Sequence, residues 1–307
     1  MPEKSVQTRL VEWPTLAMIV ACYTLWGLAT TWLTALWLPL GFVAAALAIG
    51  LHSSLQHEIL HGHPFRSKAL SEALAFPAIG LLIPYQRFRD LHLAHHRDSI
   101  LTDPYDDPES NYLDPAVWDA LPGWKQRLLA LNNTLLGRMA LGPAVSQITF
   151  VKADWAAIKA GDRAVLFGWL WHVLGLILVL YWLAAVGQMP FLLYVLAAYC
   201  GLALLKIRTF LEHRAHERAR GRTVIVEDRG PLALLFLNNN LHVVHHMHPA
   251  VPWYLLPGLF RQNRDHYLSR NDSYYYRSYG DIFRKHFLKA KDAVPHPLWR
   301  NEGADER

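Results

Sequence analysis

The chain has 307 residues, of which 52 % are hydrophobic and 12 are tryptophan, and its formal net charge is +5. This length suits one large domain or two small ones, and the apolar content is high for a soluble protein. The basic excess is better explained by membrane topology and anionic lipid headgroups than by nucleic acid, because no RNP-like or zinc-finger spacing occurs. We therefore expect a membrane protein with no nucleic-acid partner.

The first apolar block breaks at Trp37 and Pro39, which predicts membrane spans at residues 16–36 and 39–55. No small-residue cleavage site is evident near the first span, so we interpret it as retained and not as a signal peptide. Cys22 lies inside this span. Because Cys200 also lies in a predicted span, we expect no disulfide framework and exclude a thiolate metal site.

A second apolar block breaks at residues 187–190, which predicts spans at residues 164–186 and 191–205. The last span is short unless it extends to residue 210. Four spans joined by short uncharged turns form two hairpins. The predicted fold class is therefore an all-α integral membrane protein with four transmembrane helices in two hairpins and a cytoplasmic helical cap.

The segment between the hairpins contains elements of a different kind. Residues 74–84 are apolar but too few to cross a bilayer, so we expect them to lie in the interface or to re-enter the membrane. Residues 103–108 form an acidic, turn-rich loop, which we interpret as a solvated connector. Residues 116–140 and 281–291 mix apolar and basic side chains, which predicts amphipathic helices on the membrane surface.

Basic residues mark one side of the membrane. Lys4 and Arg9 precede the first span, and many arginines follow the fourth. The segment between the hairpins carries further basic residues: Arg66, Lys68, Arg87, Arg89, Arg97, Lys125, Arg127 and Lys159. The positive-inside rule then places both termini and this segment in the cytoplasm. We expect an integral protein of a bacterial inner membrane.

Three clusters of histidine recur at helical spacing, one HxxxH and two HxxHH. They comprise His57 and His61; His92, His95 and His96; and His242, His245 and His246. Residues three and four apart share a face of an α-helix, so each cluster can aim its imidazoles at one point. The predicted topology places all three on the cytoplasmic side. Three helix faces could then enclose a metal centre.

The number of imidazoles indicates which metal they would bind. Grouped imidazoles repel one another if they are protonated, and a bound metal requires the neutral form. Imidazole suits zinc, copper, iron and nickel, but eight ligands exceed a single tetrahedral zinc site. They can serve two six-coordinate ions with positions left open, and two irons are the natural interpretation, since open positions admit oxygen.

The three boxes, with the first at the end of the second span and the last after the fourth, resemble those of the membrane fatty-acid desaturase superfamily and its hydroxylase and ketolase relatives. The resemblance runs from the first span to Tyr254. It implies one desaturase-like membrane domain over residues 1–307, with two iron ions (Fe2+/Fe3+) as cofactors and O2 as co-substrate. The implied enzyme is a non-haem di-iron oxidoreductase that desaturates an aliphatic chain.

The family often has a further histidine between the last span and the third box, and His213 stands at that place. His216, three residues later, is the competing candidate. Acyl-CoA members have asparagine four residues before this histidine, whereas this chain has Thr209. We interpret the flanking His52, His63 and His248 as outer-layer or surface residues. His172, within an apolar span, is expected to be a hydrogen-bonded core residue.

Metal-bound imidazoles need an acceptor at the other ring nitrogen, which fixes the tautomer. Five carboxylates are close enough in sequence to supply some of these contacts: Glu58, Asp90, Asp98, Asp103 and Glu212. Asn238, Asn239 and Asn240 precede the third box, and we expect them to cap its helix rather than to orient its ligands.

The resemblance also implies partners. The sequence has no haem-binding HPGG segment, no GxGxxG and no cysteine cluster, so electrons must come from an external donor of the ferredoxin, rubredoxin or cytochrome b5 type. Arg284, Lys285 and Lys289 could receive an acidic donor, although membrane attachment explains these charges equally well. Membrane lipid and an aliphatic substrate are the other expected partners.

Several functions remain open at this stage. The first is desaturation of a fatty-acyl chain, which could enter the site from the bilayer. The alternatives are hydroxylation or ketolation of a lipid or carotenoid, and desaturation of a small amphiphile in a specialised pathway. A metal transporter or haem electron carrier is disfavoured, because its histidines or carboxylates would lie within the spans.

Overall fold

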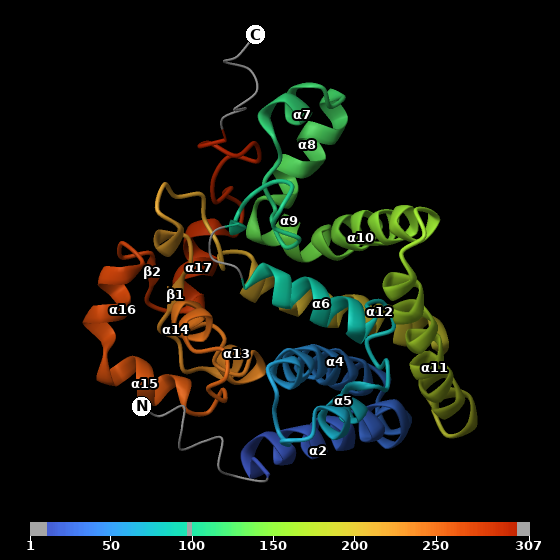
Figure 1. Ribbon diagram of the computed structural model, residues 1–307. Coiled ribbons are helices and arrows are strands. Elements are labelled where there is room, and N and C mark those ends of the chain that lie inside the picture. Colours follow the sequence, from blue (N-terminus) through green and yellow to red (C-terminus); the bar gives the residue numbers. More distant parts are fainter. Residues whose placement is uncertain (1–10, 97–99, 300–307) are drawn as a thin grey trace.

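The computed structural model describes residues 11–96 and 100–299, and it is mostly helical (Figure 1). Four helical segments are long and apolar enough to cross a membrane, as predicted. They are Trp13–Leu36, Leu38–Leu60, Arg163–Ala185 and Phe191–Thr209. Of the sequence features used above, Lys4, Arg9, Arg97 and Asp98 lie outside the described residues.

The first hairpin turns sharply between its two spans. The first span consists of α2 (Trp13–Leu28), the π-helical turn η1 (Ala29–Leu33) and α3 (Thr34–Leu36). Trp37 is extended, and α4 (Leu38–Leu60) begins with a proline in its first turn. Gly41 permits the close approach, because a Cβ there would lie 2.1 Å from Thr34 Oγ1.

Two of the expected spans extend further than predicted. The second was expected to end at residue 55, but α4 continues to Leu60 and therefore contains part of the first histidine box. In the second hairpin α11 (Arg163–Ala185) is followed by α12 (Phe191–Thr209), which exceeds the expected end at residue 205. Helices α4 and α12 pack side by side (Figure 1). Their C-terminal ends thus bring distant parts of the sequence together.

Helix α5 (Lys68–Ala75) and the loop 76–84 lead into α6 (Tyr85–His95). The loop packs among the spans: the Tyr194 hydroxyl of α12 donates to the Ile79 carbonyl at 2.6 Å. His172 Nε2 of α11 lies 2.9 Å from the Leu81 carbonyl oxygen. These contacts satisfy non-helical backbone groups that are surrounded by apolar helices.

The prediction of one continuous amphipathic helix over residues 116–140 is wrong. The structure has three short helices there, α7 (Pro115–Asp119), α8 (Gly123–Asn132) and α9 (Leu135–Ala140). Pro122 separates the first two, and the Thr134 hydroxyl caps the third by accepting from Gly137 N at 3.0 Å. The longer helix α10 (Gly142–Lys159) follows them. No helix was predicted there from the sequence.

The C-terminal part contains short elements around the third histidine box. In chain order they are η3 (Ala219–Gly221), β1 (Ile225–Val226), α13 (Pro231–Leu235), α14 (His242–Met247), α15 (Leu256–Gln262), α16 (Arg264–Arg270), β2 (Tyr275–Tyr276) and α17 (Tyr279–His286). Strands β1 and β2 pair in parallel, a small departure from the all-α expectation. Helix α17 is shorter than the expected 281–291.

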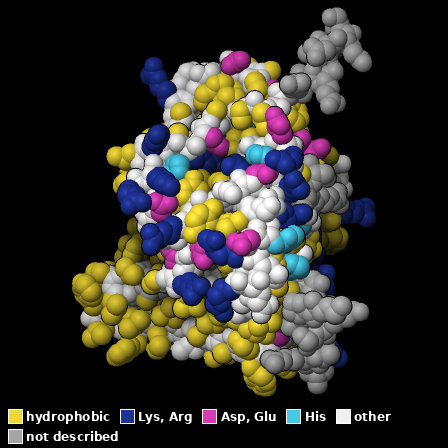
Figure 2. All heavy atoms as spheres, turned by 90° about the vertical axis from the view of Figure 1, so that its left-hand side faces the viewer, with side chains coloured by type: hydrophobic (Ala, Val, Ile, Leu, Met, Phe, Trp, Pro, Cys, Tyr) yellow, Lys and Arg dark blue, Asp and Glu magenta, His cyan; other side chains and the backbone are white. Residues whose placement is uncertain are grey.

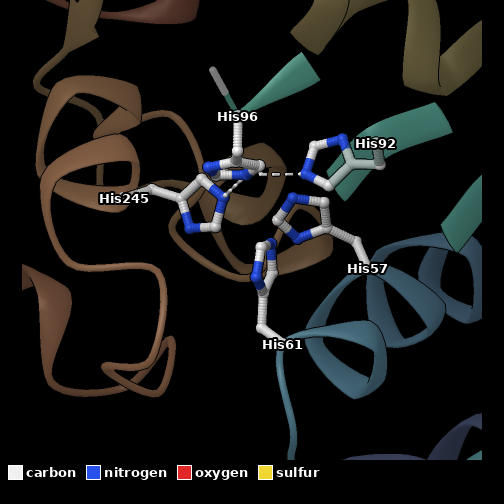
Figure 3. Close-up of side chains that lie close together, drawn as sticks. All are labelled: His57, His61, His92, His96 and His245. Carbon is white, nitrogen blue, oxygen red and sulfur yellow. Dashed lines mark hydrogen bonds between the residues drawn. The ribbon is translucent and has the colours of Figure 1, made fainter. Parts of the chain in front are cut away.

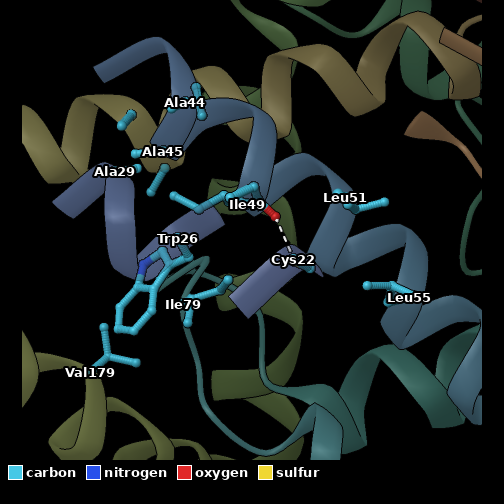
Figure 4. Packing of buried hydrophobic residues seen from close by; sticks show 14 of the residues in the cluster. Cys22, Trp26, Ala29, Ala44, Ala45, Ile49, Leu51, Leu55, Ile79 and Val179 are labelled. Carbon is cyan, nitrogen blue, oxygen red and sulfur yellow. Dashed lines mark hydrogen bonds between the residues drawn. The ribbon is translucent and has the colours of Figure 1, made fainter. Parts of the chain in front are cut away.

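The main hydrophobic core lies between α2, α4 and α12 (Figure 4). Cys22 is fully buried there with its Sγ 3.3 Å from the Ala48 carbonyl oxygen, and Cys200 is also a free thiol, as expected. The Trp26 indole donates to the Tyr194 hydroxyl at 2.8 Å. This core fixes α4 against α12, which sets the separation of the histidines at their ends.

Candidate metal centre

The nine predicted histidines come from the ends of four segments. His57 lies in the last turn of α4, and His61 directly follows the helix. His92 and His95 end α6, His96 follows it, and the third box lies on α14. His213 lies just beyond α12. The structure brings all nine together in two adjacent groups.

Group 1 contains five imidazoles whose nearest nitrogens all lie within 4.8 Å of one another: His57, His61, His92, His96 and His245. Figure 3 shows these side chains converging from α4, α6 and α14. The Nε2 atom of His96 lies 2.9 Å from that of His92 and 3.1 Å from that of His245. All three boxes therefore contribute to this group.

Group 2 contains four imidazoles within the same limit: His95, His213, His242 and His246. His213 Nε2 lies 2.9 Å from His95 Nε2 and 3.2 Å from His242 Nε2. Each HxxHH box is thus divided between the groups. Residues four apart share a helix face, so the first and third histidines of a box stay together and the middle one serves the other group.

The histidines that compete with or flank the boxes lie elsewhere. His216 contacts Arg218 and lies 3.8 Å from Asp272, so the structure brings His213 and not His216 to the cluster. His52 contacts the Tyr23 hydroxyl at 3.0 Å, and His63 Nδ1 lies 2.8 Å from Glu12. His172 is the buried, hydrogen-bonded core residue that was expected.

Three imidazoles have their outer nitrogen fixed by an acceptor. His92 Nδ1 donates to Glu109 at 2.8 Å, and His95 Nδ1 donates to Asp107 at 2.7 Å. His242 Nδ1 donates to the Asn239 side-chain oxygen at 3.0 Å. With Nδ1 protonated in a neutral ring, Nε2 carries a lone pair that points into the cluster.

Sequence reasoning missed the two carboxylates that contact the boxes. Asp107 belongs to the acidic loop that we interpreted as a solvated connector, yet its side chain is 1 % exposed and it binds His95. Glu109 follows the loop and binds His92. The spacings of twelve and seventeen residues gave no helical signal, because the loop folds back onto α6. The solvated-connector prediction is therefore wrong for Asp107.

The expected carboxylates play other roles. Glu58 accepts from Trp253 N at 2.8 Å, which joins the first box to the segment after the third. Glu212 lies 3.8 Å from His242 Nδ1 and 3.0 Å from Arg208 Nε. Asp90 pairs with Arg89, and Asp103 accepts from the Tyr105 and Asp106 amides. Neither of the last two contacts a histidine of the groups.

The asparagines before the third box do not cap its helix. Helix α14 has no side-chain hydrogen bond at its N-cap, so that prediction is wrong. Asn239 instead orients His242, and its side-chain nitrogen lies 3.4 Å from His57 Nε2. Asn240 donates to the Val226 carbonyl of β1 at 2.7 Å, and Asn238 to the Trp253 carbonyl at 3.1 Å.

The electrostatics favour neutral imidazoles at most positions. Burial, together with the neighbouring imidazoles, holds the pKa of His96, His242 and His245 well below the usual range. Burial also lowers the pKa of His95, but the Glu109 and Asp107 carboxylates outweigh it and raise the value to about 9. The Glu109 carboxyl would have a raised pKa from burial alone, yet His95 and His92 hold it well below its usual range.

This donor set fits a metal ion. In their neutral forms with Nδ1 protonated, as metal binding requires, His95 and His242 both present Nε2 lone pairs to His213 Nε2, which carries at most one proton. With neutral rings, at least one of these contacts therefore sets two lone pairs against each other. A cation between them removes the repulsion, and neutral imidazole nitrogen is the form that metals bind.

Comparison with known proteins agrees with the geometry. The profile of the family described as fatty acid desaturase matches residues 30–278. The chain belongs to the fatty acid desaturase family. A beta-carotene ketolase from Paracoccus sp. (strain N81106 / MBIC 01143) is 25% identical over 230 residues, which cover 72% of this chain and 76% of the ketolase.

Family membership and this relative make the chain an oxidoreductase of the lipid desaturase and hydroxylase type. With four apolar helices of spanning length, it is an integral membrane protein. The histidine boxes of this family member form two groups that could each hold one metal ion.

Proposed function

We propose that this protein introduces a double bond into a fatty-acyl or related aliphatic chain, with O2 and two electrons, at a di-iron centre ligated by the nine histidines. The observation that carries the proposal is the convergence of those histidines into groups of five and four. Iron, when bound, supplies the redox chemistry that activates O2. The groups of five and four imidazoles would each hold one ion.

The chain's own residues orient the ligands and exclude water. Asp107, Glu109 and Asn239 fix the imidazoles by accepting their Nδ1 protons. His92, His95, His242 and His245 are each no more than 3 % exposed, so bulk water has little access to these rings. The apolar spans that lead to the groups support an aliphatic substrate that enters from the bilayer.

Insertion of oxygen is the second candidate, because the relative is named a beta-carotene ketolase. Hydroxylation or ketolation of a lipid or carotenoid would use the same histidines. Desaturation of a small amphiphile remains a narrower form of the first proposal. The family match argues against a transporter or a haem carrier.

Both termini and the histidine groups belong, in this proposal, to the cytoplasmic side of a bacterial inner membrane. Figure 2 shows many basic side chains on the face that lies to the left in Figure 1. An external electron donor of the ferredoxin, rubredoxin or cytochrome b5 type would bind to a basic surface there. The side chains of Arg284 and Lys285 are 77% and 52% exposed, although both pair with Asp281.

Product analysis tests the reaction. The protein is expressed with a reductase system, and extracted lipids and carotenoids are compared with those of a His245→Ala strain by mass spectrometry. Loss of two hydrogens in a lipid indicates desaturation, and a gain of oxygen indicates hydroxylation or ketolation. Two irons per chain in the purified wild type are expected. No new product in any lipid or carotenoid pool would contradict the proposal.

A further inference from the structure

A small cavity of about 40 Å³ lies beside group 2, and His213 is one of the residues that line it. Polar side chains from separate parts of the chain line it. Those that matter here are Glu109, Ser110, Thr209, Glu212, His213 and Lys291. An apolar ligand does not suit such a wall, whereas water does.

Two residues that line this cavity each have a buried atom without a hydrogen-bond partner among the described residues. These atoms are His213 Nδ1 and Glu212 Oε1. Glu212 is 5 % exposed, and Arg208 Nε lies 3.0 Å from Oε1 without the geometry of a hydrogen bond. Buried polar atoms in proteins are almost always paired with protein or ordered water, so both atoms need a partner.

Lys291 supplies unused donors to the same place. Its side chain is 6% exposed, and Nζ donates to the His213 carbonyl at 3.0 Å. An ammonium group has three N–H bonds. The nearest carboxylate oxygen, on Asp292, is 3.8 Å away, and the Tyr112 ring is 5.3 Å away. The His213 carbonyl takes one of these bonds, which leaves two N–H bonds available to a ligand in the cavity.

We propose that this cavity is a binding site for ordered water, which accepts from His213 Nδ1 and Lys291 Nζ and donates to Glu212 Oε1. A water molecule both donates and accepts, so it alone matches two donors and one acceptor. The volume exceeds the roughly 10–15 Å³ that one water needs, and the partners number three. Thr209 and Ser110 add hydroxyl groups to the wall.

The site gives His213 a defined orientation. His92, His95 and His242 have protein acceptors for Nδ1, whereas the acceptor for His213 is the bound water. A proton fixed at Nδ1 leaves the Nε2 lone pair directed at group 2. Lys291 is thus a positioning residue, since it acts through the water. This consequence rests on the proposed metal centre, but the water site itself does not.

A structure of the full-length protein in lipid nanodiscs, at a resolution that shows water, tests the site directly. Density within hydrogen-bond distance of His213 Nδ1, Glu212 Oε1 and Lys291 Nζ is expected. An unfilled cavity, or a protein acceptor on His213 Nδ1, would overturn the proposal. This result is independent of whether the preparation turns over any substrate.

Metal titration tests the consequence. Thr209→Leu fills the cavity, and Thr149→Leu makes the same exchange at an exposed position of α10. Binding of Co2+ to chelator-treated protein without O2 is followed by its absorption. We expect one of the two sites to weaken by about 10–100-fold in Thr209→Leu and in Lys291→Met. Thr149→Leu should match the wild type.

Unchanged binding at both sites in the two cavity variants would reject the role in positioning. Circular dichroism and elution volume verify that these variants are folded before they are compared. If wild-type protein bound no Co2+, the proposed metal centre would be rejected. The water density would still show whether the cavity binds water. The two failures are therefore distinguishable.

Discussion

His95 Nδ1 lies 2.7 Å from Asp107 Oδ1, and each side chain is 1% exposed. Asp107 also accepts from the amides of Thr102 and Glu109, which fixes its orientation. The carboxylate thus determines which nitrogen of His95 carries the proton and which faces group 2. Charge-assisted hydrogen bonds of this kind are stronger than neutral ones, and burial strengthens them further.

Asp107→Asn should weaken metal binding at group 2. The amide retains a hydrogen-bond acceptor but loses the charge, so we expect about 10–100-fold lower affinity or activity. Metal analysis and Co2+ titration measure the effect. Asp106→Asn, one residue earlier and exposed, is the matched control and should match the wild type. Equal affinity in both variants would show that Asp107 does not orient a ligand.

His213 and His216 provide a paired test of the ninth ligand. We expect His213→Ala to lose metal from group 2 and to lower activity by more than about 100-fold, since a ligand contributes more than its outer contacts. His216→Ala should retain two metals per chain. Iron analysis of both purified variants decides, and the reverse result would assign the position to His216.

Replacing the central histidine of a box should remove metal without preventing membrane insertion. His95→Ala is expected to affect group 2 and His245→Ala group 1, because the two residues face different groups. His172→Ala should leave iron content near normal, since that ring is hydrogen-bonded to the Leu81 carbonyl and belongs to neither group. Full turnover by His95→Ala would contradict the site assignment.

In the metal-free protein, the stabilisation that His95 contributes should be lost as pH rises. Its folded state raises the pKa of His95 from 6.5 to about 9, so this stabilisation is complete below pH 6.5 and is lost as pH rises through 9. The upper limit is about 3 kcal/mol. Thermal unfolding of the chelator-treated wild type and of Asp107→Asn from pH 6 to 9.5 measures it as the difference between the two profiles, because the histidines with a lowered pKa add stability over the same rise in pH. The stability of the wild type over the variant should shrink as pH rises through 9, and a difference that does not change with pH would contradict the assignment.

An ion pair anchors the helix that carries the second box. Arg87 of α6 donates twice to Asp154 of α10 at 2.9 Å, and the Trp169 indole of α11 also donates to Asp154 at 2.9 Å. Asp154→Ala leaves the partly buried Arg87 guanidinium and the Trp169 indole without this acceptor, so we expect a loss of about 2–3 kcal/mol. Unfolding in detergent measures the free energy.

The exposed pair on α17 is the control for that experiment. Arg284→Ala removes the ion pair with Asp281 at a side chain that is 77% exposed. Pairs of this type contribute about 0–1 kcal/mol. Similar losses in Asp154→Ala and Arg284→Ala would contradict the role of Asp154 as an anchor.

Much of the architecture could be predicted from local sequence. Runs of apolar residues predicted four spans, because spanning helices need a fixed length of such residues. One continuous helix was predicted over residues 116–140 from the apolar pattern, but Pro122 interrupts it. The eight histidines of the boxes converge as their spacing suggested, and His213, expected from the family resemblance, joins them. The acidic loop was misjudged, because its composition is the same whether it is solvated or folded against α6.

The sequence by itself determined the kind of metal donor and its local spacing, since residues three and four apart on a helix share a face. Only the tertiary structure decided the division of the boxes, with His95 in group 2 and His245 in group 1. It also brought Asp107 and Glu109 to the rings. The physical reason is that these contacts depend on how α4, α6, α12 and α14 pack, which hydropathy and spacing along one segment do not encode.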